Sequence, residues 1–378
     1  MPRRNSTILI SIIIVLILAL GFAFGSPNSP FRIGTSNLVF PGVQSGPPIH
    51  AVHIEFSDYD LKGSQGAAID GYLAQANANL ISLTAGRVEW TYFKWPDHPE
   101  YWSTDVSASG TDFLAADSAH FKKYGKIDAE IDVLSPNYIK AHPAAAAIDA
   151  SGKTSTDMIG LIELTQGTYG KLLTSMVTYI AANYPDVNSI SITEMIYRTD
   201  GYGPDEKASY LQFSHQNDWP RNSDGSIAID DPSIVNWRSQ LLANFLGKLA
   251  GIAHAHGKQL FLDVSSKVDN QTQFTNESGE QLDTMLQKVD KLVVWCYYYL
   301  DGNPPDAMKI TALALQKYGA EHIILSIGLW GPNNTVMDAT MLQQGIQSAQ
   351  QGGIPNMWVT PSTLMDGSHW QVLANLWK

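Results

Sequence analysis

The sequence predicts an α/β protein built as one (β/α)8 TIM barrel. Short apolar runs alternate with amphipathic helical patterns over residues 48–378, and this alternation occurs eight times. The strands also alternate in polarity, as expected where successive side chains face the helices and the barrel interior in turn. The length of 378 residues and the 44% apolar content provide enough core for a barrel of this size.

The expected strands follow one another along the chain. They are residues 51–56, 80–93 with a turn at 85–86, 126–133, 189–195, 259–264, 292–299, 323–330 and 356–360. Helical patterns lie between them, the clearest covering residues 67–78, 112–124, 169–184 and 232–256. Because the units follow in order, a closed barrel is favoured over an open sheet.

Three strands direct carboxylates into the barrel. Apolar alternates such as Val52, Ile54 and Phe56 mark the face that packs against helices. The remaining inward-facing side chains are His53 and Glu55, then Asp128, Glu130 and Asp132, then Phe261 and Asp263. Buried acids without partners are unfavourable, so the sequence predicts either a polar, ligand-facing interior or a salt-bridge network with Arg87, Lys126 or Arg198.

The N-terminus has the pattern of an export signal. Arg3 and Arg4 precede an apolar run over residues 8–24, and the small residues 25–27 follow it. We expect residues 1–25 to be either a cleaved signal peptide or a single-pass membrane anchor. Both alternatives make the protein secreted or membrane-anchored outside the cytoplasm. Residues 26–47, rich in Ser, Pro, Gly and Asn, form the expected linker to the barrel domain at 48–378.

Composition and motifs restrict the classes of ligand and cofactor that the protein is expected to bind. The chain has 36 acids and 24 bases, a formal charge of −12, which disfavours nucleic acid because phosphate binding needs clustered cations. A neutral carbohydrate substrate fits this surface better. No metal-binding or nucleotide-binding motif occurs, so no cofactor is expected. The single Cys296, in an apolar strand, is expected to be buried packing.

Glu194 is the first catalytic candidate. It ends the expected fourth strand, and barrel enzymes keep their chemistry at the C-terminal ends of the strands. Ile190 and Ile192 share its parity, however, so a regular strand would turn Glu194 outward. A bulge or a reversal of the backbone at the strand end would be needed to bring the carboxyl inside.

Four stretches, taken in order, resemble one family. They read AHFKKYGKIDAEIDV, HPAAAAIDASGK, YPDVNSISITEMIY and DPSIVNWRSQLLANFLGKLAGIAHAHGKQLFLDVS. Their order and spacing are similar to those of the family-10-like glycoside hydrolases, secreted (β/α)8 glycosidases, and the resemblance covers residues 48–265 best. It implies a glycoside hydrolase acting on a polysaccharide or surface glycan. The sugar, its linkage, the stereochemical outcome and the oligomeric state stay open.

The chain also departs from that family pattern. The Asp-Gly expected before the fourth strand is Asn188-Ser189, and the acidic pair expected at its end is Thr193-Glu194. Trp330 stands at the end of the seventh strand, where the large retaining clan has a Glu. One carboxylate of the pair therefore remains, which leaves a second interpretation, a catalytically inactive barrel that binds glycans.

Glycoside hydrolysis needs two carboxyl groups, a proton donor and a nucleophile or base. Glu194 as the acid with Asp263 as its partner is the preferred pair, and Glu55 and Asp132 are the reserve partners. Sugar rings stack on aromatic side chains, and Trp102 and Trp219 lie in polar loops suited to this role. Further expected substrate-binding residues are Tyr197, Arg198, His215, Tyr298 and Trp330.

Overall fold

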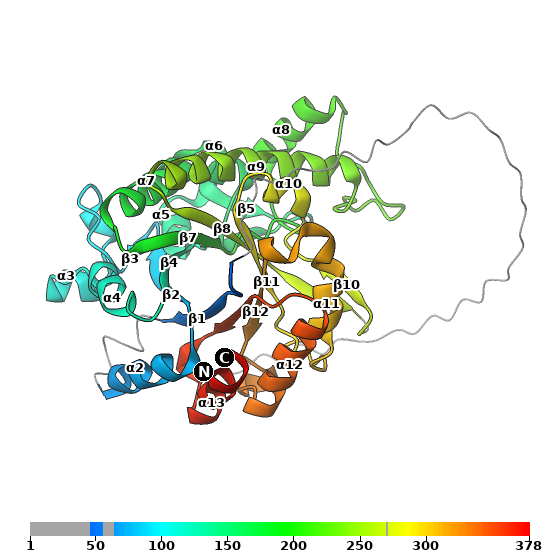
Figure 1. Cartoon of the computed structure of the whole chain (residues 1–378). Coiled ribbons are helices and arrows are strands. Elements are labelled where there is room, and N and C mark those ends of the chain that lie inside the picture. Colours follow the sequence, from blue (N-terminus) through cyan, green and yellow to red (C-terminus); the bar gives the residue numbers. More distant parts are fainter. Residues whose placement is uncertain (1–45, 56–63, 270) are drawn as a thin grey trace, which may run out of the picture. The chain divides into compact units, whose positions relative to one another are not determined.

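A computed structural model describes residues 46–55, 64–269 and 271–378. Within them, eight parallel strands close into a barrel, as the sequence predicts (Figure 1). Closure is made by β1, which pairs with β13 on one side and with β2 on the other. The barrel strands are β1 (His50–Ile54), β2 (Leu80–Arg87), β4 (Lys126–Asp132), β7 (Val187–Thr193), β8 (Gln259–Val264), β11 (Lys291–Trp295), β12 (Ile323–Gly328) and β13 (Met357–Thr360).

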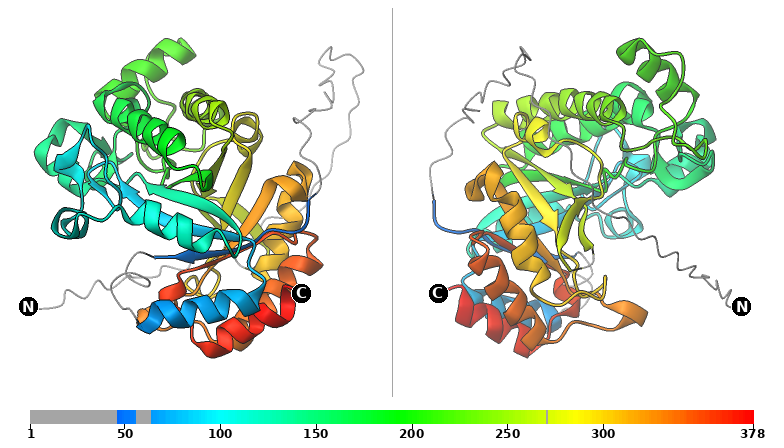
Figure 2. Two further views of the ribbon diagram at one scale, coloured as in Figure 1. Left: turned by 60° about the vertical axis from the view of Figure 1, so that its left-hand side comes forward. Right: turned by 90° about the vertical axis from the view of Figure 1, so that its right-hand side faces the viewer.

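Helices follow each barrel strand and lie outside the barrel (Figure 2). In strand order they are α2 (Ser64–Ala76), α4 (Phe113–Phe121), α7 (Thr168–Asn183), α9 (Pro232–Ala255), α10 (Leu282–Leu286), α11 (Ala307–Leu315), α12 (Ala339–Gln351) and α13 (Gly367–Leu376). Local sequence fixes several of their starts. Asp112, Asp231, Asp338 and Asp366 each accept a backbone N–H of the first turn, which is the usual role of an N-cap residue.

Additional elements decorate the ends of the strands. The two-residue strand β3 (Trp90–Thr91) folds back antiparallel on β2. The chain turns at residues 88–89 and not at the predicted 85–86, which lie inside β2, where the register shifts and Gly86 pairs with Thr91. Two further hairpins and four helices are β5 (Ala146–Ile148) with β6 (Thr154–Ile159), β9 (Ser266–Asp269) with β10 (Gln273–Asn276), α3 (Thr104–Ser109), α5 (Pro136–Ala141), α6 (Leu161–Gln166) and α8 (Pro204–Ser214). Short 3-10 turns occur at Pro99–Tyr101, Pro143–Ala145, Gln316–Tyr318, Ala320–His322, Pro332–Asn334 and Ser362–Leu364.

The strand side chains alternate between the outer and inner faces of the barrel as predicted. Outward-facing Val52, Ile127 and Leu260 belong to the large core beneath the helices, and the buried Cys296 belongs to the same core. A second, small core fills the barrel interior at the N-terminal ends of the strands, and we call it the lower plug. It consists of Ala51, Leu80, Phe261, Val293, Ile324 and Trp358. The lower plug closes the barrel interior at that end, and inside the barrel a cavity lies above it, toward the C-terminal ends of the strands.

The predicted N-terminal segment at 1–25 and most of the linker at 26–47 lie outside the described residues, as does Phe56. Among the helices of the described part of the chain, none combines the length and the apolar character needed to cross a bilayer.

Candidate active site

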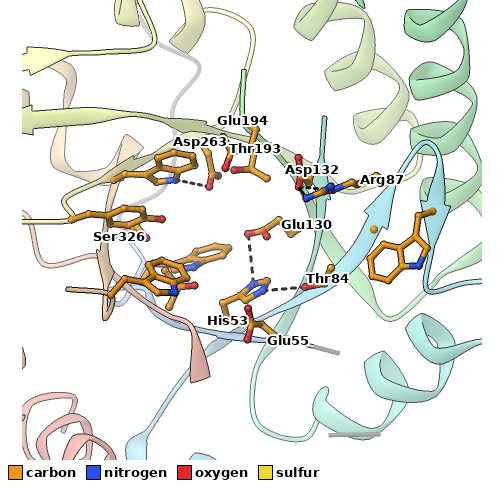
Figure 3. Close-up of a pocket in the computed structure, with 17 residues that line it drawn as sticks. His53, Glu55, Thr84, Arg87, Glu130, Asp132, Thr193, Glu194, Asp263 and Ser326 are labelled. Carbon is orange, nitrogen blue, oxygen red and sulfur yellow. Dashed lines mark hydrogen bonds and ion pairs between the residues drawn. The ribbon is translucent and has the colours of Figure 1, made fainter. Parts of the chain in front are cut away.

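A cavity of about 220 Å³ opens at the C-terminal ends of the barrel strands (Figure 3). All eight barrel strands or the residues just after them contribute to its wall. The lining side chains are mostly acidic, aromatic or hydroxylic: His53, Glu55, Thr84, Arg87, Trp90, Glu130, Asp132, Thr193, Glu194, Asp263, Trp295, Tyr297, Ser326, Trp330, Trp358 and Thr360. Glu194, Asp263, Glu55 and Asp132, the four carboxyls selected from the sequence, are therefore brought together.

Glu194 enters the cavity by a local reversal of the backbone. Along β7 the isoleucines Ile190 and Ile192 face the helices, and Ser189 and Ser191 face the interior. Glu194 has φ of 68°, the left-handed region, and this change of direction turns its carboxyl into the cavity against the strand parity. A left-handed non-glycine residue is strained, and such strain is found most often at functional sites.

The environment of Glu194 favours the protonated form. Burial raises the pKa of Glu194 to about 7, and the neighbouring Asp132 charge adds to this rise while Arg87 opposes it. A carboxyl with a pKa near neutrality can hold a proton and release it at working pH. Glu194 therefore has the property that a general acid requires.

Asp132 is the carboxyl with the firmest charge partner. Its Oδ2 accepts a hydrogen bond from Arg87 Nε at 2.7 Å and forms an ion pair with Arg87 Nη2 at 2.6 Å. Its Oδ1 accepts the Leu134 N–H at 2.7 Å. Burial raises the pKa of Asp132, whereas Arg87 lowers it. β4 and β7 are neighbours, and Asp132 lies opposite Thr193, one residue before Glu194.

Asp263 is held deeper in the cavity wall. It is 6% exposed, and its Oδ2 accepts the Trp295 indole N–H at 2.9 Å. The other oxygen, Oδ1, is buried without a hydrogen bond, although the Thr193 hydroxyl is close enough to lower the pKa somewhat. Burial, reinforced by the Glu130 charge, holds the pKa of Asp263 well above its ordinary value. Asp263 is therefore ionised less readily than an aspartate in water.

Glu130 occupies the centre of the cavity (Figure 3), and it was not among the candidate site residues chosen from the sequence. Burial, and then the charges of Asp128, Asp132, Glu194 and Glu55, raise its pKa well above the ordinary value. Its Oε2 lies 3.6 Å from His53 Nδ1. The strand parity did place Glu130 inside the barrel, so the available signal was its position on the third strand.

Beneath Glu130 a polar network anchors the cavity floor. His53 contacts the Ser82 and Thr84 hydroxyls at 3.2 and 3.1 Å. Asp128 accepts hydrogen bonds from three serine hydroxyls, at 3.1 Å from Ser82, 2.7 Å from Ser189 and 2.6 Å from Ser191. Burial raises the pKa of Asp128 to about 6, while these hydroxyls lower it. The floor is thus rigid and supplied with groups that can carry protons.

Aromatic rings form one wall of the cavity. Trp295 stacks on Tyr297 with centroids 5.3 Å apart and an interplanar angle of 7°, and Trp330 meets Tyr297 edge-on at 5.5 Å. Trp330 is 38% exposed, so its ring continues the wall to the surface. Trp295 and Tyr297 were not among the site residues predicted from the sequence. They are alternate residues after Val293 on the sixth strand and therefore face inward as it does.

The same parity explains why Tyr298 is not in the cavity. As an alternate of Tyr297 it faces outward, where it is buried and its hydroxyl donates to the Met341 carbonyl at 2.8 Å. Tyr197 is also buried, and its hydroxyl donates to the Ile159 carbonyl at 2.7 Å. Neither residue lines the cavity, because each ring is committed to packing between strands and outer helices.

The two predicted stacking platforms also lie away from the cavity lining. Trp219 is only 5% exposed and packs among Tyr202, Tyr210 and Trp237, with the Tyr210 ring stacked at 4.4 Å. A ring without a free face cannot stack on sugar, so Trp219 is a core residue. Trp102 is half-buried, and its indole N–H donates to the Trp95 carbonyl at 2.9 Å.

Two other predicted contacts have structural roles outside the cavity. Arg198 forms a two-point ion pair with Asp230, at 2.9 Å from Nε and 2.8 Å from Nη2. His215 ends α8 in the left-handed conformation, with φ of 58°. Of the expected substrate-binding residues, Trp330 is therefore the one that reaches the cavity.

The fold has well-known structural counterparts. The chain is similar to the PgaB (BpsB) glycoside hydrolase domain from Bordetella bronchiseptica, at 13% identity and a TM-score of 0.63, over 87% of this chain and 99% of that one. It is also similar to a β-galactosidase from the psychrophilic Marinomonas ef1, at 12% identity and a TM-score of 0.62, over 86% of this chain and 58% of that one. It is similar as well to the catalytic domain of a β-amylase from Paenibacillus polymyxa, at 13% identity and a TM-score of 0.58, over 87% of this chain and 97% of that one.

Identities this low show the fold alone, a glycosidase-like TIM barrel. No protein-family model matches the chain, and no curated protein matches it in sequence.

Proposed function

We propose that the protein is a glycoside hydrolase that cleaves a polysaccharide or surface glycan at the C-terminal mouth of the barrel. The observation that carries this proposal is Glu194, whose left-handed backbone turns a half-buried carboxyl with a pKa of about 7 into a cavity walled by aromatic rings. Glycoside cleavage needs two carboxyl groups, and sugar rings commonly stack on aromatic side chains. The lining of the cavity supplies both kinds of group.

In this mechanism Glu194 donates its proton to the leaving glycosidic oxygen. The partner must be ionised before substrate binds, because it either attacks the sugar or removes a proton from water. Arg87 favours the ionised form of Asp132, whereas Asp263 is buried beside Glu130 without a cation. We therefore assign the partner role to Asp132, one of the reserve carboxyls, in place of Asp263.

The proposal extends to family and location. The ordered motifs over residues 48–265 resemble the family-10-like glycoside hydrolases, and the basic-apolar N-terminus supports export by a cleaved signal or an anchor. A protease-protection assay on intact cells tests the location. A barrel domain shielded on the cytoplasmic side would contradict export.

Replacing Glu194 by Gln tests the mechanism. The amide keeps the shape but cannot give the proton, so turnover of natural glycan is expected to fall by about 10²-fold or more, with little change in substrate affinity. Substrates with an activated leaving group need little protonation and should lose much less. Asp132→Asn should impair both kinds of substrate. The exposed Asp205 of α8, which does not line the cavity, provides the control Asp205→Asn.

Full turnover by Glu194→Gln would remove Glu194 from the mechanism. The second interpretation of the sequence, an inactive barrel, makes a separate prediction: glycan binds the wild-type cavity and is never cleaved. Reducing-end release measured beside glycan binding on the same preparation separates the two interpretations.

A further inference from the structure

More carboxyl side chains line the cavity than the proposed mechanism uses. Five carboxyl side chains line it, those of Glu55, Glu130, Asp132, Glu194 and Asp263, and Arg87 is the sole lysine or arginine among the lining residues of the described structure. That guanidinium is already committed to Asp132 through two nitrogen contacts. Glu55 also has a partner, because the Thr363 hydroxyl donates to its Oε2 at 2.6 Å.

Glu130 and Asp263 have no lysine or arginine partner among the described residues that line the cavity. Asp263 Oδ1 is buried and makes no hydrogen bond, and Oδ2 is satisfied by the neutral Trp295 indole. For Glu130 the structure shows one polar contact with a described residue, the 3.6 Å approach of His53 Nδ1, which is longer than a hydrogen bond. Unused carboxylate oxygens in a buried wall are unfavourable unless a ligand supplies the donors.

The chemistry of the wall indicates what that ligand carries. Among the described residues no group of three or more His, Cys, Asp or Glu side chains is arranged to hold a metal ion. A primary ammonium supplies three N–H donors and one positive charge, enough to serve two carboxyl groups. Trp295, whose indole is bonded to Asp263, stacks with Tyr297 beside the site, and aromatic faces attract such a cation.

We propose that the cavity selects a sugar unit bearing a free amine, with the ammonium group received by the Glu130 and Asp263 carboxyls. This inference rests on the proposed function, because it names the substrate class of the same site. It assigns two acids a binding role and leaves Glu194 and Asp132 for the chemistry. The His53, Ser82 and Asp128 contacts beneath Glu130 then fix the position of the receiving carboxyl.

The charge of the site depends on every group that faces these two carboxyls. From the neighbouring strands these are His53, Glu55, Arg87, Asp128, Asp132, Glu194 and Tyr297. As pH rises the acids lose protons and attract an ammonium more strongly, until the amine itself loses its proton. Binding of an amino sugar should therefore pass through a maximum with pH, whereas binding of a neutral sugar should vary far less.

Calorimetry on the full chain tests the inference with three sugars that differ only in the group on carbon 2: glucosamine, N-acetylglucosamine and glucose. Chitosan and chitin oligosaccharides are then compared in the same way. Glucosamine is expected to bind at least about tenfold more tightly than the other two monosaccharides, since one charge-assisted contact is worth that factor. Glu130→Gln should bring the three affinities to within about twofold of one another, because the preference for the amine depends on this carboxyl.

Equal wild-type affinity for all three sugars, or an unchanged preference in Glu130→Gln, would overturn the inference. Asp263→Asn provides a second variant if Glu130→Gln fails to fold. The result is independent of turnover: a chain that binds amine-bearing glycans without cleaving them refutes the proposed hydrolysis alone, whereas a chain that cleaves neutral glycans without preferring the amine refutes this inference alone.

Discussion

The two ends of the barrel use the same strand faces for opposite purposes. On β8 the inward-facing Phe261 belongs to the lower plug, and Asp263, two residues further on the same face, lines the cavity. At the lower end asparagines tie the strand starts together, as where Asn79 and Asn356 accept the N–H groups of His50 and Ile49. At the upper end carboxyls are held above their ordinary pKa.

The comparison teaches that depth along the strand decides the role of an inward side chain. At the lower end the inward apolar residues seal the interior, and Asn79 and Asn356 bond to the backbone of β1 or the residue before it. At the upper end the inward residues are mostly polar, and one of them, Asp263, keeps a buried oxygen without a hydrogen bond, which does not stabilise the fold. The same division is general among (β/α)8 barrels, in which the lower face contributes stability and the upper face holds the functional site.

The largest expected effect separates the two ends on one strand. Phe261→Ala removes a 98% buried ring from the lower plug and should lower the free energy of unfolding by about 3–5 kcal/mol. Asp263→Asn, two residues away, should leave stability unchanged or raise it, because a buried acid without a cation is replaced by a neutral amide. Chemical denaturation of the two variants is the measurement. Equal destabilisation by the two substitutions would mean that the upper end of the barrel contributes as much to stability as the lower end.

A second comparison concerns two tryptophans. Trp219→Ala should destabilise the protein by about 3–5 kcal/mol, because the ring packs among Tyr202, Tyr210 and Trp237. Trp330→Ala should change stability little and weaken glycan binding by about 1–3 kcal/mol, because its ring is 38% exposed beside the cavity. Melting curves together with a glycan titration check both. Loss of binding without loss of stability in Trp219→Ala would restore the platform role.

The smallest effect is a pH dependence confined to the upper end. The pKa of Glu194 is about 7, above its ordinary value, so the folded protein holds a proton that the unfolded chain releases. The stability contributed by this proton is fully present below about pH 4.5 and is lost as pH rises through about 7. Glu194→Gln removes the loss, so its advantage over the wild type should grow by on the order of 1–3 kcal/mol between acid and pH 8.

Melting temperatures of the two proteins across this pH range measure the difference. The Asp205→Asn variant should keep a constant difference from the wild type, because Asp205 is exposed. A pH-independent gap between Glu194→Gln and the wild type would mean that the Glu194 carboxyl is not strained by burial.

The sequence by itself determined the barrel, the strand order and the facing of the strands. These follow from the two-residue period of a strand, a local property that Asp132, Asp263 and Glu130 express without help from distant residues. It also indicated what Glu194 would require, a reversal at the strand end, which its φ of 68° supplies.

Tertiary structure alone decided which aromatic and polar residues are open to a ligand. Trp219 and Trp102 both stand in polar loops, yet Trp219 is enclosed by α8 and α9 and Trp102 is bonded to the chain beside it. Trp90, which no expectation singled out, reaches the cavity because β3 folds back on β2. The exposure of a loop side chain depends on helices and strands from distant parts of the chain that pack against it. The sequence pattern within the loop contains no information about those contacts.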